Sequence, residues 1–95
     1  MKVLFHQSAI ADYQQWAIDD ITVFKKISAL IKEIVRTPFT GTGKPEPLRG
    51  NLAGFWSRRI TGEHRLVYKV EQDLLIIASN PLQRQMKEGV FPEKR

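Results

Sequence analysis

The chain has 95 residues, of which 42% are hydrophobic and 26% charged, which fits one globular domain with a modest core. It contains no cysteine, which excludes a disulfide scaffold and a thiolate metal site, and no segment approaches the roughly 20 apolar residues of a membrane span. A net charge of +5 points to an anionic partner. Because the chain has no cysteine and no membrane span, we expect a cytoplasmic protein with no membrane partner.

The first half of the chain predicts a strand followed by two helices. The strand is short and apolar, over Lys2–Phe5. Ser8 is a candidate N-cap for the first helix, and Asp19 or Asp20 for the second. Apolar residues recur at helical spacing in both segments. Thr37–Pro38 ends the second helix, because a residue before proline disfavours helical backbone.

The second half predicts an antiparallel meander that follows a long loop. Residues 38–54 include four glycines and three prolines, and a loop of that length in a small domain is commonly functional. Strands are expected over Phe55–Ile60, His64–Val70 and Leu74–Ser79, with short turns between them. The last strand is apolar on both faces, which favours an inner position. Together these elements predict an α+β fold.

The chain beyond Pro81 changes in composition. It is polar and charged, and after Leu82 its only large apolar residues are Met86, Val90 and Phe91. We therefore interpret residues 1–82 as one domain and residues 83–95 as a polar C-terminal tail.

The basic charge is concentrated in the middle of the sequence. Residues 36–70 contain seven basic and two acidic residues, a net charge of +5, and the rest of the chain sums to zero. Five of the seven are arginines, whose planar guanidinium matches phosphate. A phosphodiester is therefore the leading class of partner. A solvated surface with scattered arginines is the alternative.

Strand alternation assigns the arginines to the faces of the sheet. If Leu66 and Tyr68 face the helices, Arg59 and Arg65 share the opposite face. A three-residue turn would pair these two arginines directly, which is unfavourable unless an anion lies between them. The same assignment places Arg58 on the face toward the helices, so we expect it at an edge or with its charged end extended to solvent.

Glu46 is the candidate general base. It lies between two prolines, which stiffen its backbone, and it precedes a cluster of arginines. Arg49, Arg59 and Arg65 are candidates for holding a phosphate and neutralising the charge that builds on it. Glu63 either holds an arginine in place or acts as a second acid–base group. The alternative is that these side chains form ordinary surface ion pairs.

The histidines indicate no further catalytic group. His64 is next to Arg65 but on the other face of its strand, which favours a structural role, and His6 is far from the cluster in sequence. Two separated histidines without a cysteine argue against a catalytic metal, so we expect no metal or other cofactor. The segment Gly41-Thr42-Gly43-Lys44 lacks the full phosphate-loop pattern.

Four motifs carry a family resemblance. They are Arg36-Thr37-Pro38-Phe39, Gly41-x-Gly43-Lys44-Pro45-Glu46-Pro47-Leu48, Asn51-Leu52-x-Gly54-Phe55-Trp56-Ser57-Arg58-Arg59-Ile60 and Glu63-His64-Arg65-Leu66-Val67-Tyr68. They closely resemble the Txe/YoeB family of toxins from bacterial toxin–antitoxin modules. The resemblance covers residues 1 to about 79 almost without gaps.

This resemblance implies a RelE-like fold, with two N-terminal helices packed on a small, twisted, mainly antiparallel sheet. It implies a ribosome-associated endoribonuclease that cuts mRNA without a metal, by attack of the ribose 2′-hydroxyl on the adjacent phosphate. Glu46 then matches the base and Arg65 the group on the scissile phosphate, with Arg59 and Glu63 in or beside the site. Arg49 stands where relatives often have lysine. The implied partners are an acidic antitoxin, the ribosome and mRNA. A homodimer is a possible further assembly.

The chain departs from the family at its C-terminal end. Relatives typically finish with an Arg-Tyr-His-Tyr ending that supplies the general acid and a stacking tyrosine. Here Ser79 is followed by Asn80-Pro81-Leu82, and no histidine occurs after His64. The alternative function is therefore a catalytically impaired homologue that still binds antitoxin or ribosome.

Overall fold

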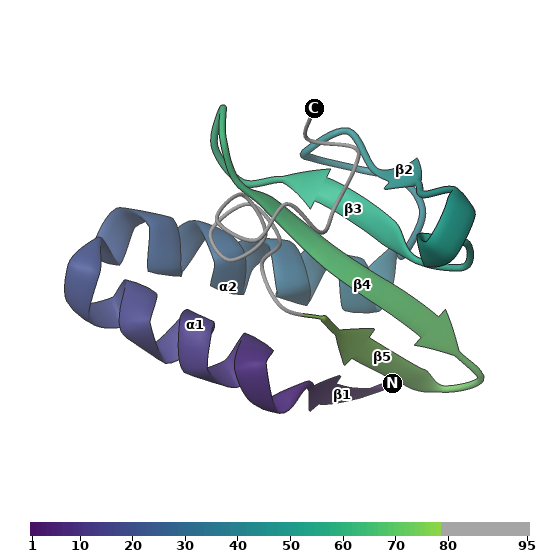
Figure 1. Cartoon of the computed structure of the whole chain (residues 1–95), viewed down its shortest axis with the longest axis horizontal. Helices are drawn as coiled ribbons and strands as arrows, with labels where there is room; N and C mark the ends of the chain where they lie inside the picture. The colour runs from purple at the N-terminus through teal and green to yellow at the C-terminus, as the bar shows by residue number, and fades with distance from the viewer. Residues whose placement is uncertain (79–95) are drawn as a thin grey trace.

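The computed structural model describes residues 1–78, which form two helices on one side of a five-stranded sheet (Figure 1). The strands are β1 (Lys2–Phe5), β2 (Glu46–Pro47), β3 (Trp56–Arg59), β4 (Arg65–Glu71) and β5 (Leu74–Ile77), arranged in the order β1-β5-β4-β3-β2. β1 runs parallel to β5, and every other neighbouring pair is antiparallel. The predicted α+β architecture of two N-terminal helices and a mainly antiparallel sheet is confirmed.

The first helix, α1 (Gln7–Asp19), begins as soon as β1 ends. The His6 amide still donates to the Ile77 carbonyl at 2.9 Å, which continues the pairing with β5, and the His6 carbonyl then accepts from Ile10. No side chain caps this helix, so the prediction that Ser8 is its N-cap is wrong. The parallel pairing of β1 with β5 fixes where α1 starts. The local sequence around Ser8 does not reveal this pairing, because β5 lies far away in the chain.

The second helix, α2 (Ile21–Arg36), starts and ends where the sequence predicts. The Asp20 carboxylate accepts from the amides of Thr22 and Val23, and Thr37 follows the last turn. The buried face consists of Val23, Ile27, Leu30 and Ile34. Phe24 and Ile31 lie beside this face and are only half-buried.

The core lies between the helices and one face of the sheet. The buried residues of the sheet on this side are Ile60, Leu66, Tyr68, Leu75 and Ile77. β5 lies between β1 and β4, so its predicted inner position is confirmed. Its Leu75 and Ile77 enter the core, whereas Leu74 and Ile76 are half-buried on the other face.

The long loop before β3 is more structured than predicted. It contains the two-residue strand β2 and a short 3₁₀ helix, η1 (Gly50–Leu52). Glu46 is paired with Ser57 and Pro47 with Trp56, so the loop adds an edge strand to the sheet. The expected strand end at Ser79 and the predicted tail over residues 83–95 lie outside the described residues.

Arg58 corrects the sequence analysis. It lies on the face toward the helices, as strand alternation predicts, but its expected exposure is wrong because the side chain is 0% accessible to solvent. Backbone carbonyls from residues 37–42 and the Glu33 carboxylate surround the guanidinium. Strand alternation gives the direction of a side chain but not the polar groups that a distant loop brings to it.

Candidate active site

The face of the sheet opposite the helices brings the two principal candidate residues together. Glu46 lies on edge strand β2 and Arg65 at the start of β4, with β3 between them. The Arg65 guanidinium forms an ion pair with the Glu46 carboxylate, with 3.7 Å between Nη1 and Oε1. The Glu46 side chain is 60% exposed and that of Arg65 30% exposed, so both remain accessible to a ligand. A carboxylate and a guanidinium thus lie together on the face of the sheet opposite the helices.

Arg59 and Arg65 are directly opposite each other across β3 and β4, as predicted. Arg65 has Glu46 as a counter-ion, while the exposed Arg59 has no carboxylate partner within residues 1–78. Directly paired like charges disfavour each other, and an anion between them removes that repulsion. The pair therefore favours binding of a phosphate at this position.

Arg49 and Glu63 lie at the ends of this region and are both exposed. Arg49 precedes η1, where its backbone has the extended conformation of a cap residue. Glu63 lies in the turn between β3 and β4, and its amide donates to the Thr61 hydroxyl at 3.2 Å. Within the described part of the chain neither side chain forms a hydrogen bond or an ion pair. The idea that Glu63 holds an arginine in place therefore has no contact to support it.

His64 has the structural role that the sequence favours. Its ring contacts the edge of the Trp16 ring at 5.1 Å between centroids, and its Nδ1 forms a hydrogen bond with the Thr61 hydroxyl at 3.1 Å. These contacts connect the β3–β4 turn to α1. His6 lies at the start of α1. Among residues 1–78, neither histidine is on the face that carries Glu46 and Arg65.

Sequence reasoning did not single out Ser57 or Lys69, which alternation places on the same face. Ser57 is the direct partner of Glu46 and of Val67 and is 1% exposed, and its hydroxyl has no hydrogen-bond partner among residues 1–78. The Lys69 ammonium lies 5.3 Å from the centre of the Phe55 ring and 3.0 Å from Glu71. The Phe55 ring is therefore partly covered by a cation.

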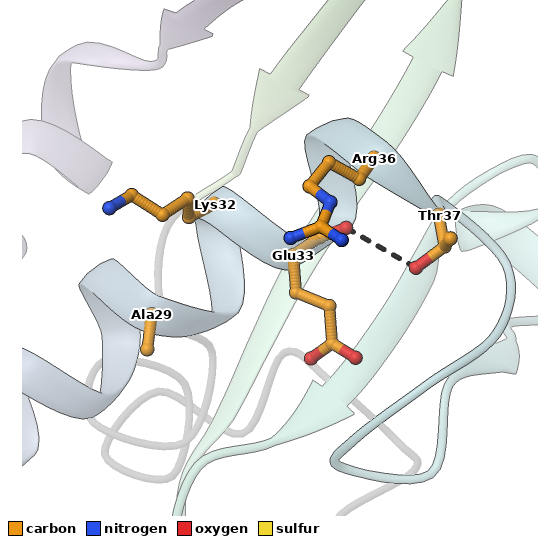
Figure 2. Close-up of a pocket in the computed structure, with 5 residues that line it drawn as sticks. All are labelled: Ala29, Lys32, Glu33, Arg36 and Thr37. Atoms are coloured by element: carbon orange, nitrogen blue, oxygen red, sulfur yellow. Dashed lines mark hydrogen bonds between the residues drawn. The ribbon is translucent and has the colours of Figure 1, made fainter.

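A shallow hollow of about 450 Å³ lies on the C-terminal part of α2 (Figure 2). Its lining consists of Ala29, Lys32, Glu33, Arg36 and Thr37, so none of the candidate catalytic residues contributes to it. The Glu33 carboxylate accepts hydrogen bonds from the hydroxyl and amide of Thr42 at 2.6 and 3.1 Å. These two bonds, followed by the charges of Arg58 and Arg36, lower the pKa of Glu33. The hollow thus borders a polar network that leads into the core.

Within residues 1–78 no group of three or more histidine, cysteine or acidic side chains is placed to hold a metal ion. Neither of the two described helices is long and apolar enough to cross a membrane.

Comparison with known proteins identifies the family. Residues 5–82 match the family described as the YoeB-like toxin of bacterial type II toxin–antitoxin systems. The chain belongs to the YoeB toxin family. It is 56% identical over 79 residues to toxin YoeB of Escherichia coli K12, a match that covers 83% of this chain and 94% of that protein.

Solved structures agree with this assignment. The YoeB/ParE toxin from Agrobacterium tumefaciens is 46% identical, with a TM-score of 0.81 over 84% of this chain and 95% of that one. YoeB from Staphylococcus aureus has been solved as a dimer and in a heterotetrameric complex with the antitoxin YefM, each with 43% identity and a TM-score of 0.79 over 84% of this chain and 93% of the other. The predicted YoeB and RelE-like assignment is therefore confirmed.

Proposed function

We propose that this YoeB toxin is a ribosome-associated endoribonuclease that cleaves mRNA without a metal, and that Glu46 and Arg65 perform the chemistry. The 3.7 Å ion pair between these two residues on an open face of the sheet is the observation that supports this proposal best. A carboxylate and a guanidinium held together can accept a proton and stabilise charge on the same phosphate.

The reaction requires one proton acceptor and one cation. Glu46 takes the proton from the ribose 2′-hydroxyl, and the 2′-oxygen forms a bond to phosphorus. The bond from phosphorus to the 5′-oxygen breaks, and that oxygen takes a proton from water, while the protonated Glu46 returns its proton to the hydroxide that is left. The products are a cyclic phosphate and a free 5′-hydroxyl. Arg65 balances the charge on the phosphate oxygens, while Arg59 and Arg49 hold the neighbouring phosphates and Glu63 lies beside the site.

The test is cleavage of mRNA on purified ribosomes, with the new 5′ ends mapped. We expect Glu46→Gln to lower the cleavage rate by about 10²–10⁴-fold, the usual contribution of a general base. Lys25→Gln, on the exposed surface of α2, is the matched control and should cleave at the wild-type rate. Cleavage that Glu46→Gln leaves unchanged would contradict the proposed mechanism.

A second function is supported by the absence of a histidine after His64 in the sequence. A protein without the family's C-terminal acid would keep its binding surface and lose most of its rate, as an impaired homologue that binds antitoxin or ribosome. Inserting a Tyr-His-Tyr ending after Ser79 distinguishes the two functions. A wild-type chain that arrests growth as strongly as the altered chain supports the active toxin. Arrest by the altered chain alone supports the impaired homologue.

The antitoxin partner follows from the charge of the same face. The Staphylococcus aureus relative forms a complex with YefM, and we propose an acidic antitoxin segment that covers Arg59 and Arg65 in this chain. Co-expression with the product of a short neighbouring reading frame tests this proposal. Complex formation that becomes weaker in Arg59→Gln is the expected result, and an unchanged affinity contradicts it. A homodimer is the other assembly to measure, because a relative forms one.

A further inference from the structure

Arg58 is a fully buried cation in the layer between the sheet and the helices. Its side chain is 0% exposed, and a guanidinium does not lose its proton in a protein. A buried charge is costly unless hydrogen bonds and an opposite charge compensate it. The partners that provide this compensation therefore show what the residue holds in place.

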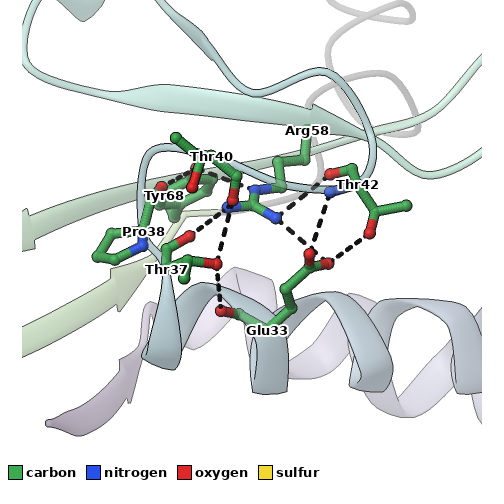
Figure 3. Close-up of polar contacts among 7 residues, drawn as sticks. All are labelled: Glu33, Thr37, Pro38, Thr40, Thr42, Arg58 and Tyr68. Carbon is green, nitrogen blue, oxygen red and sulfur yellow. Dashed lines mark hydrogen bonds and ion pairs between the residues drawn. The ribbon is translucent and has the colours of Figure 1, made fainter.

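Most of these partners belong to one segment, the chain from Thr37 to Thr42 (Figure 3). Arg58 Nη2 donates to the carbonyls of Thr37 and Thr40 at 2.6 and 2.8 Å, and Nη1 donates to the carbonyl of Thr42 at 3.2 Å. Within the 37–42 segment there is no helix or strand to satisfy these carbonyls. Hydrogen bonds from the guanidinium therefore hold the backbone of this segment in its conformation.

Two further side chains complete the network. Tyr68 accepts from Arg58 Nε at 3.2 Å and donates to the Pro38 carbonyl at 2.6 Å. Glu33 forms an ion pair with Arg58 at 3.4 Å and also accepts from Thr42. Strand β4, through Tyr68, and helix α2, through Glu33, thus contact the segment directly and also contact Arg58.

The segment leads directly to Glu46. The Gly43 carbonyl accepts from the Arg59 amide at 2.7 Å, and Glu46 pairs with Ser57. Residues 43–45 separate Thr42 from Glu46, and prolines on both sides of Glu46 limit how the backbone can adjust. A shift of Thr42 therefore displaces the Glu46 carboxylate relative to Arg65.

We infer that Arg58 is a positioning residue for Glu46. Its guanidinium gathers the carbonyls of the 37–42 segment, and this arrangement fixes β2 so that the Glu46 carboxylate meets Arg65. Stability alone does not require an arginine here, because apolar residues can often replace a buried ion pair without loss of stability. The inference rests on the proposed role of Glu46 as the base.

The experiment compares Arg58→Lys with wild type in two measurements. One is the rate of single-turnover mRNA cleavage on ribosomes, and the other is the dissociation constant of the complex between the protein and the mRNA-loaded ribosome. Lysine keeps the charge but cannot donate to several carbonyls in one plane. We expect the cleavage rate to fall by about tenfold or more, because small displacements of reacting groups are costly, while the dissociation constant changes by less than about threefold. Arg36→Lys, exposed at the end of α2, is the matched control and should keep both values.

Hydrogen exchange gives a readout that does not depend on cleavage. The amides of Thr42 and Arg59 report the position of the segment through their bonds to Glu33 and Gly43. We expect both to exchange faster in Arg58→Lys while the amides of α2 retain wild-type exchange. If Arg58→Lys does not fold, Glu33→Gln is the second variant. It removes the charge of the more exposed partner in the Arg58–Glu33 ion pair, and it should lower the cleavage rate without weakening binding to the ribosome.

The outcomes separate this inference from the proposed function. A wild-type rate in the folded Arg58→Lys protein, or equal losses of rate and affinity, overturns the positioning role. Wild-type hydrogen exchange at the Thr42 and Arg59 amides overturns it as well. If Arg58→Lys does not fold, a wild-type cleavage rate in Glu33→Gln has the same consequence. A cleavage rate that Glu46→Gln does not alter refutes the proposed function instead, and the exchange measurement then decides whether Arg58 holds the segment.

Discussion

At the scale of the residue, Gly41 shows how closely the Arg58 network is packed. Its φ is +124°, a conformation that residues with a side chain rarely adopt. A β-carbon added there would lie 3.1 Å from Arg58 Nη1 and closer still to the Glu33 carboxylate. The glycine therefore allows both the turn and the approach of Glu33 to Arg58.

We expect Gly41→Ala to destabilise the protein by about 1–3 kcal/mol, because the substitution adds backbone strain and displaces Glu33. Gly62→Ala is the matched control, since its φ is not positive and no atom lies within 4 Å of the added carbon. Urea denaturation of both variants measures the difference. Equal unfolding midpoints for the two variants would show that the close packing around Gly41 has no energetic effect.

Glu33 gives the network a pH dependence. Its pKa is lowered in the folded state, chiefly by the Thr42 hydroxyl and amide and then by Arg58 and Arg36. The stabilisation is present above the ordinary glutamate pKa of about 4.3 and is lost as the pH falls through the lowered value. We expect Glu33→Gln to lose less stability than wild type between pH 7 and pH 3. Thr42→Val, which removes the largest cause, should show an intermediate loss, and parallel stability curves would contradict this assignment.

At the scale of the element, the two helices begin in different ways. Asp20 caps α2 through bonds to the Thr22 and Val23 amides at 3.1 and 3.4 Å, whereas α1 starts after His6 with no side-chain cap. Pairing of β1 with β5 fixes the start of α1 instead. Local sequence therefore determines one helix start, and the sheet determines the other.

We expect Asp20→Ala to reduce the free energy of unfolding by about 1 kcal/mol, the usual value of an N-cap. Ser8→Ala provides the comparison, because Ser8 resembles a cap in the sequence but forms no capping bond in the structure. Its substitution should change stability by less than about 0.5 kcal/mol. Thermal unfolding of the two variants measures both values. An equal loss in both would mean that Ser8 acts as a cap in solution.

At the scale of the whole molecule, the fold divides the arginines of residues 36–70 by role. Arg58 is enclosed between the sheet and the helices, while Arg59 and Arg65, on the opposite face, are open to solvent to different degrees. The net charge of +5 therefore overstates the charge that a ligand meets on any one face. Under the proposed function, binding of RNA should therefore depend on the exposed basic residues and not on Arg58.

Salt dependence measures this contribution. In a Glu46→Gln background, which is expected to slow cleavage, we expect Arg59→Gln to reduce the slope of log affinity against log salt by about 0.7 for single-stranded RNA, the value for one lost phosphate contact. Lys25→Gln changes net charge equally but lies on α2, so its slope should equal that of the background protein. Equal changes in both variants would indicate that net charge, not the Arg59 face, governs binding.

The sequence by itself determined both helices, four of the five strands and the residues proposed for the candidate site. Local patterns predicted both helices, the three strands of the meander and the direct pairing of Arg59 with Arg65, because capping, alternation and turn length are short-range properties. The motif around Glu46 identified a candidate base. These features depend on neighbours within a few residues.

Only the tertiary structure decided where distant segments meet. It paired β1 with β5, turned part of the long loop into the edge strand β2, and set the Glu46 carboxylate 3.7 Å from the Arg65 guanidinium. It also buried Arg58, which the sequence alone placed at an edge or with its charged end extended to solvent. The carbonyls that satisfy its charge come from residues 16 to 21 positions earlier in the chain. Burial of a charge depends on such long-range partners, and strand alternation carries no information about them.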